Sequence, residues 1–150
     1  MGESAPPPKV RFKKLRPGAL LPRYMSAGAA GLDLASAADG PIEIAPGARV
    51  AVPTGLAFDI PAGFEGQVRP RSGLARKFGI GLPNAPGTID SDYRGEVMVL
   101  LVNLGAEPYT VQPGDRVAQL VIAPVVVAEL EEVAELDATV RGHGGFGHTG

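Results

Sequence analysis

Short segments rich in Val and Ile, separated by turn-forming residues, run along most of the chain. Some alternate apolar and polar residues, as Ile42-Glu43-Ile44 does, and others are apolar throughout, which predicts strands buried on both faces. Four Pro-Gly pairs favour turns, because Pro presets φ and Gly accepts positive φ. The predicted strands lie in IEIA (42–45), ARVAVPTGLAFDI (48–60), EGQVRP (65–70), EVMVLLVNL (96–104) and RVAQLVIAPVVVAEL (116–130).

One segment alone has helical character, SGLARKFG (72–79), and it spans barely two turns. Ser72 is well placed there as a helix N-cap. Many short strands with turns between them predict an all-β sandwich or barrel. The chain shows no internal repeat and no second domain.

Composition and charge narrow the class of protein. The 150 residues suit one domain, and the 21 glycines and 15 prolines agree with many turns. The absence of cysteine excludes disulfides and thiolate metal sites. A net charge of −2 argues against broad nonspecific binding to nucleic acid, although a local basic pocket stays possible. No apolar run reaches the roughly 18 residues that span a bilayer, and MGESAPPPKV lacks the apolar centre of a secretory signal, so we expect a cytoplasmic protein.

Around the segment NAPGTIDSDYRGEVMVLLVN (84–103) we predict a hairpin, because two β-type arms, GIGLPNAP (79–86) and RGEVMVLLVN (94–103), flank a turn-forming centre. Ser91 and Asp92 are explained equally well as turn residues. Asp90 follows the β-branched Thr88 and Ile89, so we expect its side chain to point inward from a strand. A carboxylate in that position is costly unless it is paired or catalytic.

Two further segments suit anion binding. VRPRSGLARKFG (68–79) places Arg71 and Ser72 at the entry to the helix, where an anion can be gripped, although a solvated surface arginine is the plain alternative. In PGDRVAQLV (113–121) we expect Asp115 to shape the turn and to pair with Arg116. Gln119 lies in an apolar run, where its amide needs hydrogen-bond partners.

Two glycine-rich segments leave alternatives open. In AGAAGLDLASA (27–37), Asp33 is either a turn residue or the holder of a water on a metal ion. The terminal RGHGGFGHTG (141–150) is half glycine and reads as a frayed end, yet Arg141 suits an anion and Phe146 suits stacking on a flat ring.

Together and in this order, AGLDL, RPRSGLA, GTIDSDYRGEV, PGDRVAQLV and RGHGGFGHTG resemble the five motifs of the trimeric dUTP diphosphatase (dUTPase) family. The resemblance runs from about Val10 to the C-terminus. It implies a distorted jelly-roll or β-clip barrel with one short helix, in a homotrimer with shared active sites. The implied reaction is Mg²⁺-assisted hydrolysis of dUTP to dUMP and pyrophosphate, which limits uracil in DNA and supplies dUMP for thymidylate synthesis. The implied divisions are a flexible lead (1–9), the barrel (10–137) and a mobile Gly-rich lid (138–150).

The resemblance also implies residue roles. Asp90 would be the general base for water attack on the α-phosphorus, and Asp33 would hold a metal-bound water. The phosphates would meet Arg71, Ser72, Gly73 and Gln119. Uracil would pair with Asn84 and with backbone groups around Gly87, Thr88, Ile89 and Met98, which leaves no room for a 5-methyl group.

Selection at the sugar and closure of the site complete these roles. Tyr93 would pack under the sugar and exclude a 2′-hydroxyl. In the lid, Phe146 would stack on uracil, while Arg141 and the backbone from Gly147 to Thr149 would close over the phosphates. His148 stands where the family usually has Ser, and His143 is expected to be merely exposed in the tail.

Two other functions are weighed against this one. A dCTP deaminase shares the fold, but the stacking tail and the GTIDSDYRGE hairpin fit the diphosphatase. A nonenzymatic nucleotide-binding trimer would require loss of the base, and Asp90 is present.

Overall fold

Residues 6–148 are described by the computed structural model, and they form twelve β-strands and one short α-helix. The first strands are β1 (Arg11–Lys14), β2 (Arg23–Tyr24), β3 (Leu32–Ala35), β4 (Ile42–Ile44), β5 (Arg49–Pro53), β6 (Leu56–Asp59) and β7 (Phe64–Arg69). The remaining elements are α1 (Ser72–Phe78), β8 (Ile80–Gly81), β9 (Gly87–Ile89), β10 (Met98–Asn103), β11 (Tyr109–Val111) and β12 (Arg116–Pro124). Residues 1–5 of the predicted lead and the predicted contact of Thr149 lie outside the described residues.

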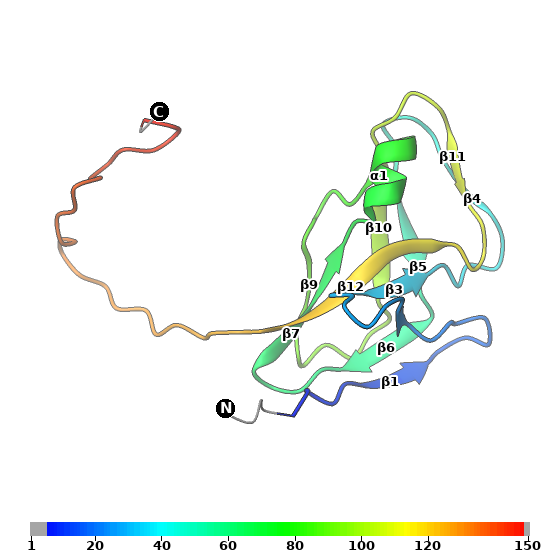
Figure 1. Ribbon diagram of the computed structural model, residues 1–150, viewed down its shortest axis with the longest axis horizontal. Coiled ribbons are helices and arrows are strands. Elements are labelled where there is room, and N and C mark those ends of the chain that lie inside the picture. The colour runs from blue at the N-terminus through cyan, green and yellow to red at the C-terminus, as the bar shows by residue number, and fades with distance from the viewer. Residues whose placement is uncertain (1–5, 149–150) are drawn as a thin grey trace.

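The strands pair in antiparallel fashion around one apolar core (Figure 1). A five-stranded sheet has the order β2-β3-β12-β7-β9, and a three-stranded sheet has the order β5-β10-β8. Two ribbons, β1-β6 and β11-β4, complete the arrangement. Leu34 and Leu120 of the larger sheet belong to the same buried cluster as Val99 and Leu101 of the smaller one. The predicted all-β class with one short helix is confirmed.

The last strand is shorter than predicted. The sequence predicts β character as far as residue 130, but β12 ends at Pro124. Pro124 pairs with Phe64, the first residue of β7, so no partner strand remains for the residues that follow. Val125 N donates to Gly63 O at 2.9 Å. The chain then runs away from the barrel as an extended tail, and Val126 is 92% exposed (Figure 1).

The predicted hairpin is confirmed in part: its two arms pair antiparallel through β8 and β10, but β9, which lies between them in the sequence, enters the other sheet. The residues before the turn form β8, which pairs with β10, and β9, which pairs with β7 instead. Two prolines, Pro83 and Pro86, separate β8 from β9. Proline has no N–H to donate to a strand ladder, so pairing with β10 stops there and β9 joins the neighbouring sheet.

The helix begins one residue earlier than the predicted cap requires. Arg71 is the N-cap, with φ −95° and ψ 126°, and its carbonyl accepts the amide of Ala75 at 3.1 Å. Ser72 is therefore the first helical residue, and no side chain caps the helix by a hydrogen bond. The expectation that Ser72 is the N-cap is wrong.

The other end of the helix is fixed against β10. Gly79 ends the helix with φ 72°, a conformation that favours glycine. A Cβ on Gly79 would lie 2.6 Å from the backbone nitrogen of Gly105, so the two segments can approach only without side chains. Asn103 is fully buried and donates to Ile44 O at 2.9 Å and to Glu107 O at 2.7 Å. The helix and the segment before it are thus tied to the core.

Within residues 6–148 there is no helix with the length and apolar character that a bilayer span requires.

Candidate functional site

A pocket of about 260 Å³ opens between β9, the turn after it and the start of β10. Of the eight residues predicted to handle the base, the sugar and the attacking water, all but Phe146 line it: Asn84, Gly87, Thr88, Ile89, Asp90, Tyr93 and Met98. The walls also include residues that the sequence did not single out: Val68, Leu82, Glu96, Val97 and Leu100. All but Glu96 are apolar residues of the kind expected in a core strand, so nothing in the sequence distinguishes those four as lining.

Asp90 lies at the rim of this pocket rather than inside the protein. Along β9, Gly87 and Ile89 are buried while Thr88 is exposed. Strand side chains alternate between faces, so the next position, Asp90, continues the exposed side. The prediction that its carboxylate points inward is therefore wrong for a single chain. Tyr93 N donates to Asp90 O at 3.1 Å, which closes the turn behind the carboxylate.

A second group of polar residues forms a row across the five-stranded sheet. The register places Asp33 of β3 opposite Arg23 on one side and Gln119 on the other, and Gln119 opposite Arg69. Asp33 sits within a strand, so its reading as a turn residue is wrong. Antiparallel pairing thus brings together residues far apart in the sequence.

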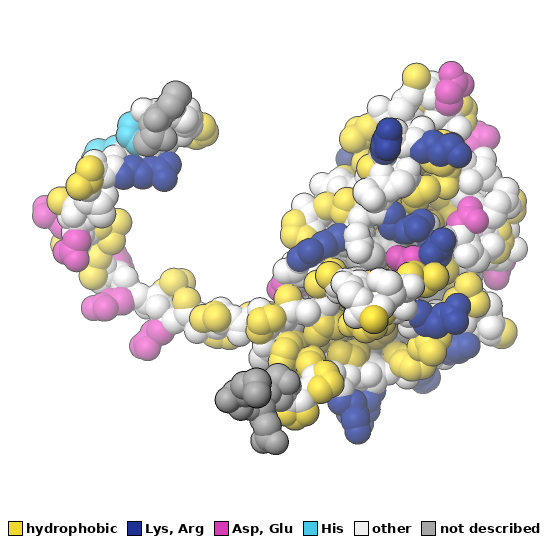
Figure 2. All heavy atoms as spheres, viewed as in Figure 1, with side chains coloured by type: hydrophobic (Ala, Val, Ile, Leu, Met, Phe, Trp, Pro, Cys, Tyr) yellow, Lys and Arg dark blue, Asp and Glu magenta, His cyan; other side chains and the backbone are white. Residues whose placement is uncertain are grey.

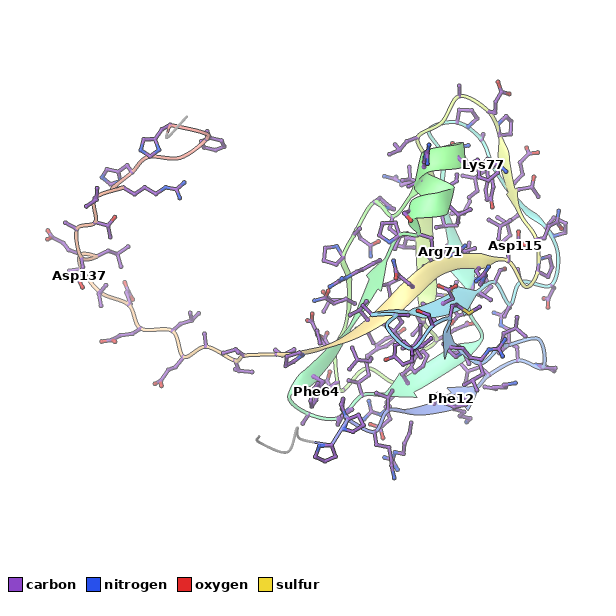
Figure 3. All side chains as sticks on the ribbon, in the orientation of Figure 1. Phe12, Phe64, Arg71, Lys77, Asp115 and Asp137 are labelled. Carbon is purple, nitrogen blue, oxygen red and sulfur yellow. The ribbon has the colours of Figure 1, made fainter. Side chains whose placement is uncertain are left out.

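Two arginines share the carboxylate of Asp33. Arg116 Nη1 donates to Asp33 Oδ2 at 2.9 Å, and Arg71 Nε lies 3.7 Å from Oδ1. The predicted Arg116 pair with Asp115 is absent among the described contacts, because Asp115 Oδ2 instead accepts the amide of Gln112 at 2.8 Å. That bond confirms the turn-shaping role of Asp115. Figure 3 shows Arg71 between the start of α1 and β12.

Gln119 finds the hydrogen-bond partner that its place in an apolar strand requires. Its Nε2 donates to Pro70 O at 3.0 Å, next to Arg71. Arg71 Nη1 also donates to Arg116 O at 3.1 Å. A Cβ on Gly31 would lie 2.6 Å from Gln119 Oε1, so the glycine makes the space for this amide. These bonds hold Arg71 and Gln119 in the same part of the sheet.

The surface around this group is cationic. Lys and Arg side chains are spread over the face that carries α1 and β12 (Figure 2). Burial raises the pKa of the Tyr109 hydroxyl above its ordinary value; the Asp115 carboxylate adds to this effect and the Arg71 guanidinium opposes it. Tyr109 is therefore a neutral phenol at neutral pH and adds no negative charge beside Arg71.

The tail carries a third group of predicted site residues, Arg141, Phe146 and Gly147, which lies apart from the pocket and from the group around Asp33 (Figure 1). Arg141 Nε donates to Gly144 O at 2.7 Å within a local turn, and the Phe146 ring is fully exposed. Gly147 has φ 78°, and His143 and His148 are exposed. In Figure 1 these residues lie at the far end of the extended tail.

One chain does not bring the predicted site residues together. Across residues 6–148, no side-chain hydrogen bond or ion pair joins the pocket, the Asp33–Arg71–Gln119 group and the tail. The same range contains no cluster of three or more His, Asp or Glu side chains able to hold a metal ion. The chemistry predicted for these residues needs a further copy of the chain, movement of the tail, or both.

Comparison with known proteins identifies the family of this chain. A family model described as dUTPase matches residues 18–150. Curated proteins named deoxyuridine 5′-triphosphate nucleotidohydrolase are similar over most of their length. The one from Anaeromyxobacter sp. (strain Fw109-5) is 66% identical and covers 87% of this chain and 87% of its own. The one from Syntrophotalea carbinolica is 58% identical and covers 94% of this chain and 96% of its own.

Solved structures show the same fold. The Staphylococcus bacteriophage 80alpha dUTPase with dUPNHPP superposes with a TM-score of 0.87 at 26% identity, covering 95% of this chain and 98% of its own. A mutant dUTPase from phage phi11 of S. aureus, described with a structural Mg(II) ion, gives 0.77 at 25% identity over 85% of this chain and 97% of its own. The resemblance and fold predicted from the five motifs are confirmed.

Proposed function

This chain belongs to the dUTPase family, and on that premise we propose that it hydrolyses dUTP to dUMP and pyrophosphate at sites shared between the copies of a homotrimer. One observation carries the proposal. The residues suited to the base and the attacking water line one pocket, and those suited to the phosphates cluster elsewhere. In a shared site, the pocket of one copy faces the cationic group of its neighbour.

The free edge of β9 suits a pyrimidine. This strand ends the order β2-β3-β12-β7-β9, so one row of its backbone groups has no strand partner among the described residues. A Cβ on Gly87 would lie 3.1 Å from Asn84 Nδ2, so the glycine lets the amide sit against this edge. Uracil pairs with these fixed groups, whereas cytosine presents the wrong donors and acceptors, and unpaired buried groups reject such analogues strongly.

Tyr93 provides the selection against ribose. Its ring lines the same pocket and packs under the deoxyribose, where a 2′-hydroxyl finds no space. Met98, at the start of β10, contributes its backbone to the uracil edge from the opposite wall. UTP is therefore excluded by its 2′-hydroxyl against Tyr93, and dTTP by its 5-methyl group at the uracil edge.

The cationic group binds the phosphates. Arg71 offers a guanidinium that grips phosphate oxygens, and Asp33 holds it in place together with Arg116. Gln119 Nε2, already fixed on Pro70 O, keeps a second N–H for a phosphate oxygen. Ser72 and Gly73, both exposed at the start of α1, add a hydroxyl and a close backbone approach. These groups stabilise charge on the leaving pyrophosphate.

The residues present fit a magnesium ion that is carried mainly by the substrate. Mg²⁺ keeps several waters and takes few carboxylates, which agrees with the lack of a dense acidic cluster in residues 6–148. Asp33 would hold one of its waters, with the triphosphate supplying the other ligands. When bound, the ion neutralises phosphate charge and orients the triphosphate.

Asp90 activates the attacking water. Its carboxylate accepts a proton from the water as the water oxygen forms a bond to the α-phosphorus. The bond from the α-phosphorus to the oxygen bridging to the β-phosphorus breaks, and pyrophosphate leaves with that electron pair. The rim position of Asp90 leaves its carboxylate accessible to a water beside the bound nucleotide.

The tail, residues 138–150 after the barrel of residues 10–137, acts as a lid. Phe146 stacks on the uracil, while Arg141 and the backbone around Gly147 cover the phosphates. The ring is fully exposed and Arg141 is engaged only within its own turn, so both are available for a nucleotide held by other copies. Closing a lid of this kind excludes water from the reacting phosphates.

The activity is tested by incubating the protein with dUTP or dCTP and Mg²⁺ while following pyrophosphate and ammonia. We expect pyrophosphate from dUTP and neither product from dCTP. Ammonia from dCTP would instead identify a deaminase, and tight dUTP binding without turnover would identify a nonenzymatic nucleotide-binding protein. Light scattering on the same sample should give the mass of three chains.

A further inference from the structure

Gly95 is the residue on which the Tyr93 ring rests. A Cβ on Gly95 would lie 2.6 Å from Tyr93 Cζ and 3.0 Å from Cε2, and would collide with the hydroxyl oxygen as well. These distances are shorter than real Cβ contacts, so the ring occupies space that any larger residue would fill. The Tyr93 hydroxyl donates to Glu96 O at 2.9 Å, which holds the ring across the glycine.

The backbone around the glycine is held from outside the pocket. Arg94 Nη1 donates to Ser91 O at 2.6 Å and to Tyr93 O at 3.0 Å, and its Nη2 donates to Asp59 at 2.8 Å. These bonds tie the turn to the end of β6. The turn thus has little freedom to move as a unit when a side chain beside it grows.

Glu96 holds the other side of the same turn. Its Oε1 accepts the amide of Gly55 at 2.9 Å and lies 3.2 Å from Arg16 Nε. The carbonyl that receives the Tyr93 hydroxyl is therefore fixed to the segment between β5 and β6. Because the backbone is held at both Arg94 and Glu96, the tyrosine ring is the part that must yield.

The backbone of Gly95 itself tolerates a side chain. Its φ does not lie in the left-handed region, unlike that of Gly79 or Gly55, so alanine causes no backbone strain there. The collision at Gly95 involves the far end of a side chain, whereas the one at Gly79 involves the backbone of Gly105. A substitution at Gly95 thus displaces Tyr93 without disturbing the core.

We propose that Gly95 is a specificity-determining positioning residue, which lets the Tyr93 ring lie where it refuses a 2′-hydroxyl. The inference rests on the proposed function, since it assumes that Tyr93 packs under the sugar. The glycine touches no substrate and acts through the tyrosine alone. Selection against ribose is then set by a hydrogen bond and a missing Cβ behind the ring, as well as by the ring itself.

Gly95→Ala should lower the ratio of kcat/KM for dUTP to kcat/KM for UTP by at least about tenfold, the scale of a small change in steric fit. The matched control is Gly81→Ala. Gly81 directly precedes Leu82 of the same pocket, its φ is not left-handed, and a Cβ there meets no atom within 4 Å in the described chain. The control should keep the wild-type ratio, and both variants should keep the wild-type circular dichroism and oligomeric mass.

A double-mutant cycle separates action through the ring from a general effect. In a Tyr93→Ala background, adding Gly95→Ala should leave the ratio unchanged within about threefold, because the colliding ring is gone. An unchanged ratio in the single Gly95→Ala variant would overturn the inference, as would loss of the folded oligomer, since the ring would then not be the part that yields. A further fall of the ratio in the double variant would contradict action through Tyr93. Failure of the proposed function looks different: the wild-type protein would not hydrolyse dUTP or would not refuse UTP.

Discussion

Asp90→Asn is expected to lower kcat for dUTP by about 10³-fold, within the range that a positioned general base contributes. An amide keeps the size and polarity of the carboxylate but cannot accept the proton of the attacking water. Asp90 is exposed at the pocket rim, and none of the described side-chain hydrogen bonds or ion pairs involves its carboxylate, so the substitution leaves the fold intact. Nucleotide affinity should change little, because the base and phosphate contacts remain. Single-turnover hydrolysis and equilibrium binding of a dUTP analogue measure the two quantities separately.

Asp92→Asn is the matched control for that variant. Asp92 lies two residues further in the same turn, is also exposed, and carries the same charge. Asp92 does not line the pocket between β9 and β10, so the kcat of the Asp92→Asn variant should stay near that of the wild-type protein. Equal turnover by Asp90→Asn and the wild-type protein would show that another group activates the water. Equal loss in both variants would show that the net charge of the turn matters rather than one base.

Removal of residues 141–150 is expected to leave a folded oligomer whose kcat/KM for dUTP falls by about 10²-fold or more, the scale of losing a closing lid that orients the substrate. The barrel should survive because its described core includes no residue beyond Ile122. Circular dichroism and light scattering check the fold and the mass, and initial rates check turnover.

Two point variants divide the effect of the deletion. Phe146→Ala should reproduce a large part of it, since the exposed ring is the stacking group of the lid. His143→Ala should not, because the proposed lid assigns no nucleotide contact to this exposed residue. A truncated protein with full activity would refute the lid and return the tail to a frayed terminus.

The sequence predicts the strands of this barrel better than their partners. Alternation and Pro-Gly turns predict β4, β7 and β10 within a residue or two of their bounds, because both signals are local. Pairing between sheets is not local, so the predicted hairpin accounts for the pairing of β8 with β10 but not for β9, which pairs with β7 in the other sheet. The apolar run after Pro124 shows the same limit, because composition cannot reveal that β7 provides no further partner.

The candidate site divides in the same way. The motifs identify Asp90, Arg71 and Gln119 from residue type and order alone. The alternation along β9 puts Asp90 on the exposed side, and the pairing of β12 with β3 brings the Arg116 side chain within reach of Asp33; both depend on how the chain folds back on itself. The bonds that hold the turn around Tyr93, from Arg94 to Asp59 and from Gly55 to Glu96, join residues far apart in the sequence, so no local pattern predicts them.

Sharing of the site between copies is tested most directly by mixing two inactive variants. Asp90→Asn loses the base and Arg71→Ala loses a phosphate contact, and the two positions lie in separate groups of one chain. After joint unfolding and refolding in equal amounts, random trimers should recover about a quarter of wild-type activity, because each mixed cyclic trimer has one intact site in three. Activity in the mixture no greater than the sum of the two separate variants would show that each chain uses its own Asp90 and Arg71, and would contradict the shared site.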